Sequence, residues 1–459
     1  MPFDPITRRQ FSRLAMVNAF AAMACRPRHG TSGAITDRHP FGSGGLVPMA
    51  NRPLELPPGF RCAVVQGVGD VMSCGNRAPA QPDGMTCQMD EHGNYVLLRN
   101  HELFDRAWTS KLPEYASGLP ERSAPAGRAY NDDMFGGVSR LVIDPKALAD
   151  GLESGDARNA VRHSNLVLTG TAFNCSGGAV PSGWVSCEET DHPKHGYAFM
   201  TLATDTELVD PVERRITSWG RFKREGVTAH LDAGVVYMTE DHAKGCFYRF
   251  IPADPEVLTG PGEVQALKAV GVADSDPAEA HSQGASWAVE WVTIDDPQAE
   301  QLPCREQAQS NGATRFNRCE GSTLANGHLW FIASTAGPVG AGQVFRYDPA
   351  SERLHLEVQV TNRAVLSMPD NVTTTPWGDL LMTEDNYNAG GGATHQYIRG
   401  LRLDGTVYDF GRNPANGPED CGAELTGPCF SPDGRYLFLN IQSPLGLTVV
   451  IEGPWPQVS

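Results

Sequence analysis

The stretch 316–335, FNRCEGSTLANGHLWFIAST, contains the plan on which much of the chain is built. An acid and a glycine, Glu320-Gly321, come first; a turn signal follows at Asn326-Gly327, and then an apolar run. Asn-Gly between two extended runs is a strong hairpin signal, because a tight primed turn needs positive φ at both central residues. The stretch therefore predicts a β-hairpin that carries an acid near its start.

The same plan recurs five more times along the chain. Aligned on the turn glycine, the other copies are 83–102, 175–189, 225–241, 370–385 and 426–442. Each copy starts with a potential ligand side chain, turns near its midpoint, continues as an apolar strand and ends on a polar residue. Since the two strands of a hairpin run back along each other, the first and last residues of each copy should meet at one end.

Repeated antiparallel units of this kind most economically close into a ring. We therefore expect an all-β fold, a six-bladed β-propeller with long inserted loops and a few short peripheral helices. The repeats exceed the roughly 40–50 residues of compact propeller repeats, so loops must be inserted. The largest insertion, 253–315, is predicted to be a cap or lid, and the strand at 55–67 is expected to complete the last blade. The alternative is a set of unrelated hairpins in an ordinary β-sandwich.

Composition limits the function classes. The 459 residues carry a formal net charge of −17, which argues against sequence-independent nucleic-acid binding because such binding needs a basic patch. The acidity is compatible with cation binding, although it also serves solubility. The 49 glycines and 34 prolines suit a turn-rich β protein. We expect a monomer without a nucleic-acid partner.

The N-terminus has the features of a twin-arginine signal peptide, predicted to span 1–30. Arg8-Arg9 is followed by Phe11 and Leu14 and then by a weakly apolar stretch that is too short to span a membrane. We therefore expect the twin-arginine translocation machinery as a partner, a periplasmic or extracellular location, and no membrane span. The alternative is an accidental Arg-Arg pair near the start.

Cys25 ends the apolar stretch and is a candidate site of lipid attachment. Ala22 stands where lipoprotein signals usually carry Leu, so a lipid anchor stays open. We predict a linker at 31–54 and the propeller domain at 55–459. An exported protein can form disulfides. Three cysteine pairs are close in sequence and their bonding stays open: Cys304 with Cys319, Cys421 with Cys429, and Cys62 with Cys74.

The ends of the hairpins collect acids and one cysteine. So many carboxylates around one axis would repel each other unless cations neutralise them. Oxygen ligands favour Ca²⁺ or Mg²⁺, whereas a thiolate among carboxylates favours a transition ion such as iron. Cys175 is the sharpest signal, with a buried structural cysteine or half-disulfide as the alternative. The predicted metal ligands are Cys175, Glu225, Glu320, Glu188, Glu189, Asp370, Glu102, Glu240, Asp241, Glu384 and Asp385.

Basic residues stand beside these acids. Lys223 and Arg224 precede Glu225, and Arg318 lies two residues before Glu320. An Arg at a metal-lined mouth suits phosphate or carboxylate, which its planar fork grips, although a surface salt bridge is an equal alternative. The predicted substrate-binding residues are Arg318, Arg224 and Thr426. No G-x-S-x-G elbow, P-loop or dinucleotide-binding glycine pattern occurs in a supporting context, which argues against serine hydrolases and nucleotide-dependent enzymes.

Taken as an ordered set, several motifs resemble those of PhoX-type alkaline phosphatases. They are RNHE (99–102), GGVSRL (136–141), NCSGG (174–178), SCEE (186–189), HGYAF (195–199), GRFKREGV (220–227), RCEG (318–321), PDN (369–371) and TGPCFSPDGRYLFLNIQ (426–442). The resemblance implies an exported propeller phosphomonoesterase that uses Fe³⁺ and Ca²⁺. It also implies that a metal-bridging oxygen attacks phosphorus without a serine phosphoenzyme.

By the same resemblance, Cys175, Glu225 and Glu320 would be metal ligands, and Arg318 would hold the phosphate, so that Arg318, Glu320 and Cys175 are the predicted catalytic residues. Glu188, Glu189, Asp370 and other rim acids would be shared among calcium ions. The chain departs from the family, which commonly has His in place of Arg224 and Pro in place of Cys319. Two alternatives need neither the thiolate nor Arg318: a calcium-dependent propeller lactonase or sugar hydrolase, and a non-catalytic calcium-bound binding propeller.

Overall fold

The structure is a computed structural model that describes residues 41, 45–48, 53–116, 127–272, 281–386, 395–413, 423–442 and 446–456. The predicted signal peptide, Cys25, most of the predicted linker and Cys421 lie outside these residues. In this part of the chain, none of the helices has the length and apolar character that crossing a bilayer requires.

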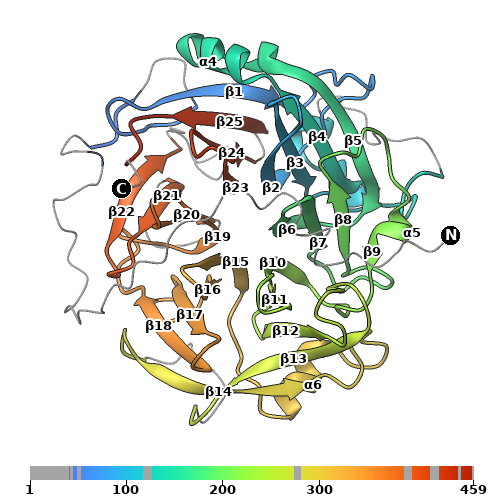
Figure 1. The fold of residues 1–459 in the computed structure, drawn as a ribbon, viewed down its shortest axis with the longest axis vertical. Coiled ribbons are helices and arrows are strands. Elements are labelled where there is room, and N and C mark those ends of the chain that lie inside the picture. The colour runs from blue at the N-terminus through green and yellow to red at the C-terminus, as the bar shows by residue number, and fades with distance from the viewer. Residues whose placement is uncertain are drawn as a thin grey trace.

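Within the described residues, the strands form four four-stranded antiparallel sheets and one nine-stranded sheet around a common centre (Figure 1). The first sheet contains β2 (Pro82–Met89), β3 (Tyr95–His101), β4 (Gly136–Ile143) and β5 (Val161–Thr171). The second contains β6 (Asn174–Val180), β7 (Gly183–Glu188), β8 (Ala198–Leu202) and β9 (Arg215–Ile216). A further sheet contains β19 (Pro369–Thr374), β20 (Leu380–Glu384), β21 (Tyr397–Leu401) and β22 (Val407–Arg412).

The nine-stranded sheet has an inner strand at each of its two ends. Its order is β10 (Arg224–His230), β11 (Val235–Glu240), β12 (Phe247–Pro252), β13 (Gly262–Ala269), β14 (Ser286–Thr293), β18 (Arg353–Gln359), β17 (Gln343–Asp348), β16 (His328–Ala333) and β15 (Cys319–Ala325). The prediction of an all-β propeller is confirmed, but the sheets are not six separate blades. Strand β14, from the insertion 253–315, pairs with both β13 and β18. The described part of this insertion lies at the outer edge of the ring rather than over the centre (Figure 1).

The ring closes by pairing the start of the chain with its end. Strand β1 (Arg61–Gly67) pairs with β25 (Leu447–Glu452), which continues through β24 (Tyr436–Ile441) to β23 (Leu425–Phe430). The prediction that the strand at 55–67 completes the last blade is therefore confirmed. At the centre, β2, β6, β10, β15, β19 and β23 contact one another in a closed cycle. The inner edge of each sheet is thus a short strand that faces the centre of the ring, as in other propellers.

Local sequence explains these elements. Asn326 and Gly327 adopt φ of 52° and 77°, as the predicted primed hairpin turn requires. The few helices are short and peripheral, and the longest, α4 (Pro145–Ser154), begins at Asp144, whose side chain accepts hydrogen bonds from two backbone amides. The others are α2 (Arg106–Thr109), α3 (Pro113–Ala116), η1 (Arg158–Ala160), α5 (Pro211–Arg214) and α6 (Cys304–Ser310).

The hydrophobic core lies between neighbouring sheets. Leu97 of β3 and Phe438 of β24 are fully buried in one shared cluster, which joins the first sheet to the last. Phe247 of β12 stacks on Phe331 of β16 with ring centroids 4.2 Å apart, which joins the two halves of the nine-stranded sheet. Because these apolar faces pack against each other, the polar ends of the inner strands are left to meet at the axis.

Each of the six inner strands contains a β-bulge at a similar level. In β15, Cys319 pairs with Ala333 but Ser322 pairs with Phe331, so Glu320 and Gly321 lie in a one-residue bulge. The same shift occurs in the other five, at 82–85, 174–177, 224–227, 369–372 and 426–429. A bulge bends a strand and re-aims its side chains. Five equivalent bulges therefore direct five equivalent side chains, whereas the bulge of β23, at Gly427 and Pro428, lies one residue later.

Glycine at the bulge lets neighbouring inner strands approach each other. A Cβ at Gly321 would lie 2.7 Å from the carbonyl oxygen of Asp370 and 2.9 Å from the amide nitrogen of Val372. Both are backbone atoms, which cannot rotate away as a flexible side chain would.

We expect Gly321→Ala to lower the free energy of unfolding by about 1–3 kcal/mol, because the added methyl forces β15 away from β19. Gly45→Ala is the matched control, since no atom lies within 4 Å of its added Cβ. Unfolding in guanidinium chloride, followed by fluorescence, would measure the free energy of unfolding of both variants. Equal midpoints for the two variants would contradict the close approach.

Candidate metal centre

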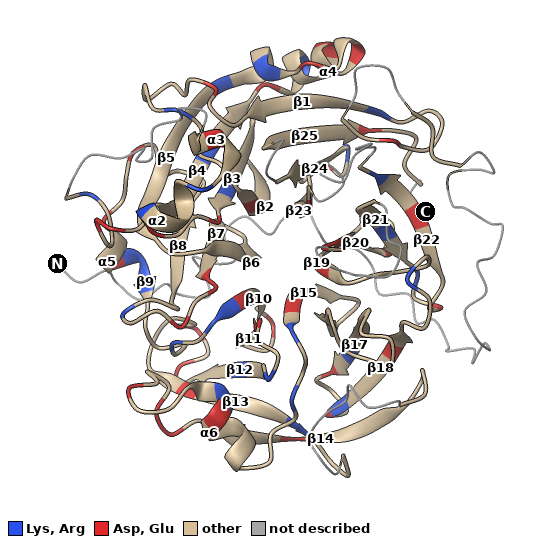
Figure 2. Cartoon of the chain, turned by 180° about the vertical axis from the view of Figure 1, so that it is seen from behind, with Lys and Arg blue, Asp and Glu red and all other residues tan. Residues whose placement is uncertain are grey.

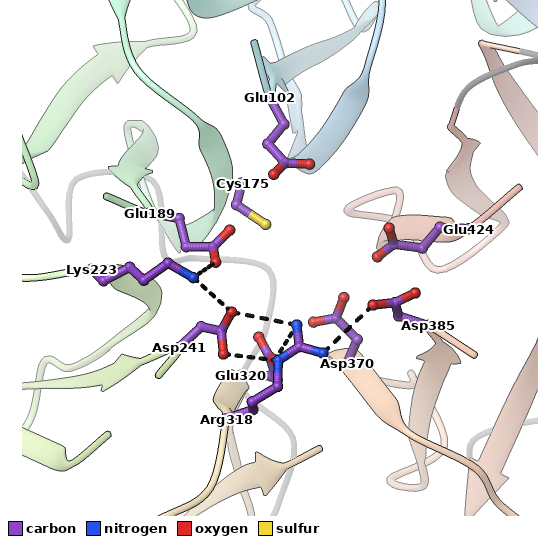
Figure 3. Close-up of a pocket in the computed structure, with 10 residues that line it drawn as sticks. All are labelled: Glu102, Cys175, Glu189, Lys223, Asp241, Arg318, Glu320, Asp370, Asp385 and Glu424. Atoms are coloured by element: carbon purple, nitrogen blue, oxygen red, sulfur yellow. Dashed lines mark hydrogen bonds and ion pairs between the residues drawn. The ribbon is translucent and has the colours of Figure 1, made fainter. Parts of the chain in front are cut away.

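The ends of the six inner hairpins surround a cavity of about 390 Å³ (Figure 3). Ten residues, mostly acids, line it: Glu102, Cys175, Glu189, Lys223, Asp241, Arg318, Glu320, Asp370, Asp385 and Glu424. Seen from behind, the inner ends of β10, β15 and β19 show basic and acidic segments facing the centre of the ring (Figure 2). The cavity is therefore strongly charged, with both signs present.

Three positions of each hairpin explain which side chains meet there. The inner position is Asp83, Cys175, Glu225, Glu320 or Asp370, each in its bulge, or Thr426, which pairs with Asn440 just before the last bulge. The return position, just after the second strand, is Glu102, Glu189, Asp241, Ser334, Asp385 or Gln442. The rim position, two residues before the inner one, is Gln81, Phe173, Lys223, Arg318, Met368 or Glu424. In all six hairpins, the return amide donates a hydrogen bond to the rim carbonyl, which fixes the two beside each other.

Four overlapping groups of these side chains could each hold a metal ion, with ligand atoms within 4.8 Å of one another. They are Asp83–Glu102–Cys175, Cys175–Glu189–Glu225, Glu225–Glu320–Asp370 and Asp370–Asp385–Glu424. The Cys175 Sγ lies 3.7 Å from Asp83 Oδ2 and belongs to two of the groups. The predicted convergence of Cys175, Glu225, Glu320 and Asp370 on one axis is thus what the structure contains.

Electrostatics shows that the cluster needs cations. Among the described residues of the cavity and the four groups, nine carboxylates face only two basic side chains, Lys223 and Arg318. Burial, followed by the neighbouring acids, raises the pKa of Glu225 well above its ordinary value, and burial raises the pKa of Glu102 to about 7. Burial and nearby carboxylates also raise the pKa of the Cys175 thiol.

Glu225 shows most directly that these residues fit metal ions. Its side chain is fully buried, and neither carboxylate oxygen has a hydrogen-bond partner within the described part of the chain. Leaving a buried carboxylate unpaired is costly, and buried charges are ordinarily paired or bound to metals. Because two of the four groups share Glu225, cations there would satisfy both of its oxygens.

The two basic residues join the acids into a chain of ion pairs. Lys223 Nζ lies 2.5 Å from Glu189 and 3.0 Å from Asp241. Arg318 donates to Asp241 from Nε at 3.0 Å, and its Nη2 lies 3.1 Å from Glu320. Burial acts to raise the pKa of Asp241, but Arg318 and Lys223 outweigh it and hold that pKa well below its ordinary value.

Arg318 also has φ of +53°, an uncommon conformation for a residue with a side chain. Gln81, Phe173 and Met368, at the rim position of other hairpins, have φ of 49°, 46° and 47°, so this conformation belongs to the start of the hairpin and is held by surrounding contacts. Here the Arg318 amide donates to the His242 carbonyl, and its carbonyl accepts from the Ser334 amide. The backbone thus places this guanidinium on the cavity wall.

Three predicted ligands lie away from the cavity. Glu188 accepts hydrogen bonds from the His195 ring at 2.6 Å and from a backbone amide. Glu240 accepts from Tyr248 and Arg305, and Glu384 from Arg399 and a backbone amide. Each immediately precedes a return residue. Because successive side chains of a strand point to opposite faces, the first acid of each pair points into the protein and the second into the cavity.

Two predicted substrate-binding residues are also elsewhere. Arg224 is fully buried, donates to the carbonyls of Trp219 and Gly220, and lies over the Phe222 ring. The Thr426 hydroxyl donates to the Pro82 carbonyl at 2.9 Å, which ties the last inner strand to the first.

Glu424 lines the cavity although sequence reasoning missed it. It lies two residues before Thr426, outside the aligned copy, at the rim position that Lys223 and Arg318 occupy in other hairpins. The signal that could have found it is this spacing of two. Cys304 and Cys319, a candidate disulfide, carry free thiols, as does Cys74.

A family model described as Alkaline phosphatase PhoX matches residues 41–445. The fold is similar to that of Pseudomonas fluorescens PhoX in complex with vanadate, a transition state analogue, with a TM-score of 0.63, 17% identity, and coverage of 89% of this chain and 97% of that chain. A gluconolactonase from Xanthomonas campestris has a TM-score of 0.35 at 13% identity, covering 90% of this chain and 98% of its own. A comparison with curated proteins gives no match.

We expect the metal-free protein to lose stability as the pH rises from about 5 to about 8. The pKa of Glu102 rises from 4.5 to about 7 on folding, so in this window the folded state keeps a proton that the unfolded chain has released. The lowered pKa of Asp241 has the opposite effect only below about pH 4, outside the window. Melting temperatures after chelation should be higher at pH 5 than at pH 8.

Glu102→Gln should flatten this pH dependence, whereas the exposed Glu91→Gln should leave it unchanged. Calcium should restore stability more at pH 8 than at pH 5, since ionised carboxylates bind it. A metal-free protein that melts higher at pH 8 would contradict the repulsion within the cluster.

Proposed function

This chain belongs to the PhoX family of alkaline phosphatases, and on that premise we propose that its central acidic cluster is an iron and calcium site. The protein is a metal-dependent hydrolase of phosphate monoesters. The observation that carries the metal assignment is the position of Cys175, a single sulfur shared by two groups of potential ligands beside the unpaired carboxylate of Glu225.

The donor atoms differ along the cluster, and this difference supports different metals at different groups. Cys175 with Glu189 and Glu225 offers a thiolate among carboxylates, which favours iron. The all-oxygen groups Glu225–Glu320–Asp370 and Asp370–Asp385–Glu424 favour calcium. When bound, these ions would supply Lewis acidity toward the phosphoryl oxygens and toward water.

Arg318 is the group best placed to hold the phosphate. Its side chain is 32% exposed, whereas the Glu320 side chain beside it is 3% exposed. A guanidinium presents two parallel N–H groups that match the geometry of a phosphate, and it stays charged throughout the reaction. Arg318 would bind and orient the ester and neutralise charge that develops as the ester bond breaks.

The cavity supports direct hydrolysis rather than a serine phosphoenzyme. Of the described residues that line it, none is Ser, Thr or His. The Cys175 thiol and the carboxylates are placed as potential metal ligands, and burial raises the pKa of that thiol, which disfavours a free thiolate. We therefore assign Cys175 and Glu320 as metal ligands of the catalytic centre, with water as the attacking group.

Glu188, Glu240 and Glu384 are better interpreted as structural residues, because each is already neutralised by hydrogen bonds or an ion pair away from the cavity. We also interpret the ring as six blades. The nine-stranded sheet would then be two four-stranded blades joined at their outer edges by β14, which agrees with a cycle of six inner strands.

Export through the twin-arginine route, with a periplasmic or extracellular location, is part of the same proposal. It rests on Arg8-Arg9 and the apolar stretch that follows them. Arg8→Lys together with Arg9→Lys should leave the protein in the cytoplasmic fraction, whereas correct export of this variant would contradict it. The monomeric state and the absence of a nucleic-acid partner stay predictions.

We expect purified protein to contain iron and calcium, and Cys175→Ala to lose iron together with at least roughly 100-fold in hydrolysis of p-nitrophenyl phosphate. Chelation with EGTA should abolish turnover. Cys74→Ala is the matched control, since that cysteine is exposed and free. Elemental analysis and initial rates are the measurements. Full activity in both EGTA and Cys175→Ala would exclude the proposed centre.

Arg318→Ala should lower kcat/KM for the phosphate ester by roughly 10²–10³-fold, because charge at the breaking bond loses its partner. Arg77→Ala, a change of an exposed Arg outside the cavity, should have no effect. The same variants would be assayed with lactones. Lactone hydrolysis that survives Arg318→Ala, without ester hydrolysis in the wild type, would favour a propeller lactonase instead.

A further inference from the structure

Lys223 and Arg318 occupy the same rim position on neighbouring hairpins. Each lies two residues before an inner acid, and each carbonyl accepts the hydrogen bond from the return amide of its own hairpin. Their inner strands, β10 and β15, are in contact. The two cations therefore reach the cavity from adjacent, equivalent places (Figure 3).

Both cations are more open to the cavity than the acids they contact. The side chains of Lys223 and Arg318 are 30% and 32% exposed, whereas the Asp241 side chain is 5% exposed. The buried acids are positioned for partners within the wall. Although both cations are in ion pairs, a ligand that enters the cavity can still contact them.

Asp241 lies between the two cations and contacts both. Its Oδ2 is 3.0 Å from Lys223 Nζ, and its Oδ1 accepts from Arg318 Nε at 3.0 Å. Both oxygens are therefore taken by protein cations, and Asp241 belongs to none of the four groups that could hold a metal ion among the described residues. This differs from its predicted role as a metal ligand.

The donors of Lys223 leave room for a ligand. An ammonium group has three N–H donors, and two of them are directed at Glu189 and Asp241. Glu189 belongs to the group that contains Cys175 and Glu225. A cation bound there would draw on the Glu189 carboxylate and release a further donor of Lys223 toward the cavity.

We propose that Lys223 is a second phosphate-binding residue, which contacts the phosphoryl oxygens together with Arg318, and that Asp241 is the positioning residue for both cations. This inference rests on the proposed phosphatase function and deepens it. Arg224 was the predicted second basic contact, but it is buried in the sheet. The proposal assigns that contact to Lys223, its neighbour in the sequence. The substrate class implied is a dianionic phosphate monoester, whose charge two adjacent cations match.

The test compares Lys223→Gln, Lys223→Arg and Asp241→Asn with the wild type, each as the full metal-loaded protein. Calorimetric binding of inorganic phosphate is the main measurement, because it does not depend on turnover. The Kd for phosphate and the KM for p-nitrophenyl phosphate should rise about tenfold in Lys223→Gln, the loss expected for one hydrogen bond between charged groups. Lys223→Arg should stay within about threefold, because it keeps the charge.

Lys268→Gln is the matched control, since Lys268 pairs with Glu290 on the outer strands. It should leave phosphate binding unchanged. Iron and calcium content should equal that of the wild type in every variant. Asp241→Asn should weaken phosphate binding at unchanged metal content, because both cations lose their shared anchor.

Wild-type phosphate affinity in Lys223→Gln would overturn the proposal. Loss of metal from that variant would also overturn it, because Lys223 would then be a structural counter-ion. If Lys223→Gln does not fold, Asp241→Asn decides, and unchanged phosphate affinity there overturns the proposal. A wild type that neither hydrolyses the ester nor binds phosphate would remove the proposed function as well. Ester hydrolysis with an unaffected Lys223→Gln would remove only this inference.

Discussion

Repulsion among buried carboxylates is the constraint on which the rest of this structure depends. In a site of low effective dielectric, like charges a few ångströms apart cannot all stay ionised without counter-charges. The protein supplies two of these itself, Lys223 and Arg318, and both are committed to Asp241 on one wall. Neither carboxylate oxygen of Glu225, in contrast, has a hydrogen-bond partner within the described residues. Metal ions bound at these acids would therefore stabilise the axis of the ring in addition to taking part in the chemistry.

The propeller fold causes this repulsion among carboxylates and also limits it. Closure brings six inner strands into one cycle, and the common bulge turns one residue of each strand toward the axis. The alternation of side chains along a strand then separates adjacent acids with different roles. In Glu188-Glu189, the first is held by the buried His195 and the second faces the cavity. The same division holds for Glu240-Asp241. A pair of acids thus anchors the strand end and supplies a carboxylate to the cavity.

Much of the fold was predictable because its signals are local. The Asn-Gly turn, the recurrence of the hairpin and the extra strand at the N-terminus are all visible within short windows of sequence. The convergence of Cys175, Glu225, Glu320 and Asp370 followed from hairpin geometry alone. Joining of two sheets through β14 was not predictable, because it depends on pairing between strands far apart in the chain. The choice between adjacent residues, such as Lys223 and Arg224, depends on register, which a single sequence fixes only once the bulge is known.

The six hairpins carry different side chains at equivalent positions, so the cavity is not symmetric. The hairpin that carries Arg318 at its rim has Ser334 instead of an acid at its return position, and the last hairpin has Gln442, which donates to Asp83 and Glu102. Acids nonetheless lie beside both cations: Lys223 contacts Glu189 and Asp241, and Arg318 contacts Asp241 and Glu320. A ring of six identical acidic tips would bind cations without orienting an ester. Because the two cations lie directly beside potential metal ligands, the cations and bound metal ions could hold the phosphoryl group of a substrate together, an arrangement that favours hydrolysis of a monoester.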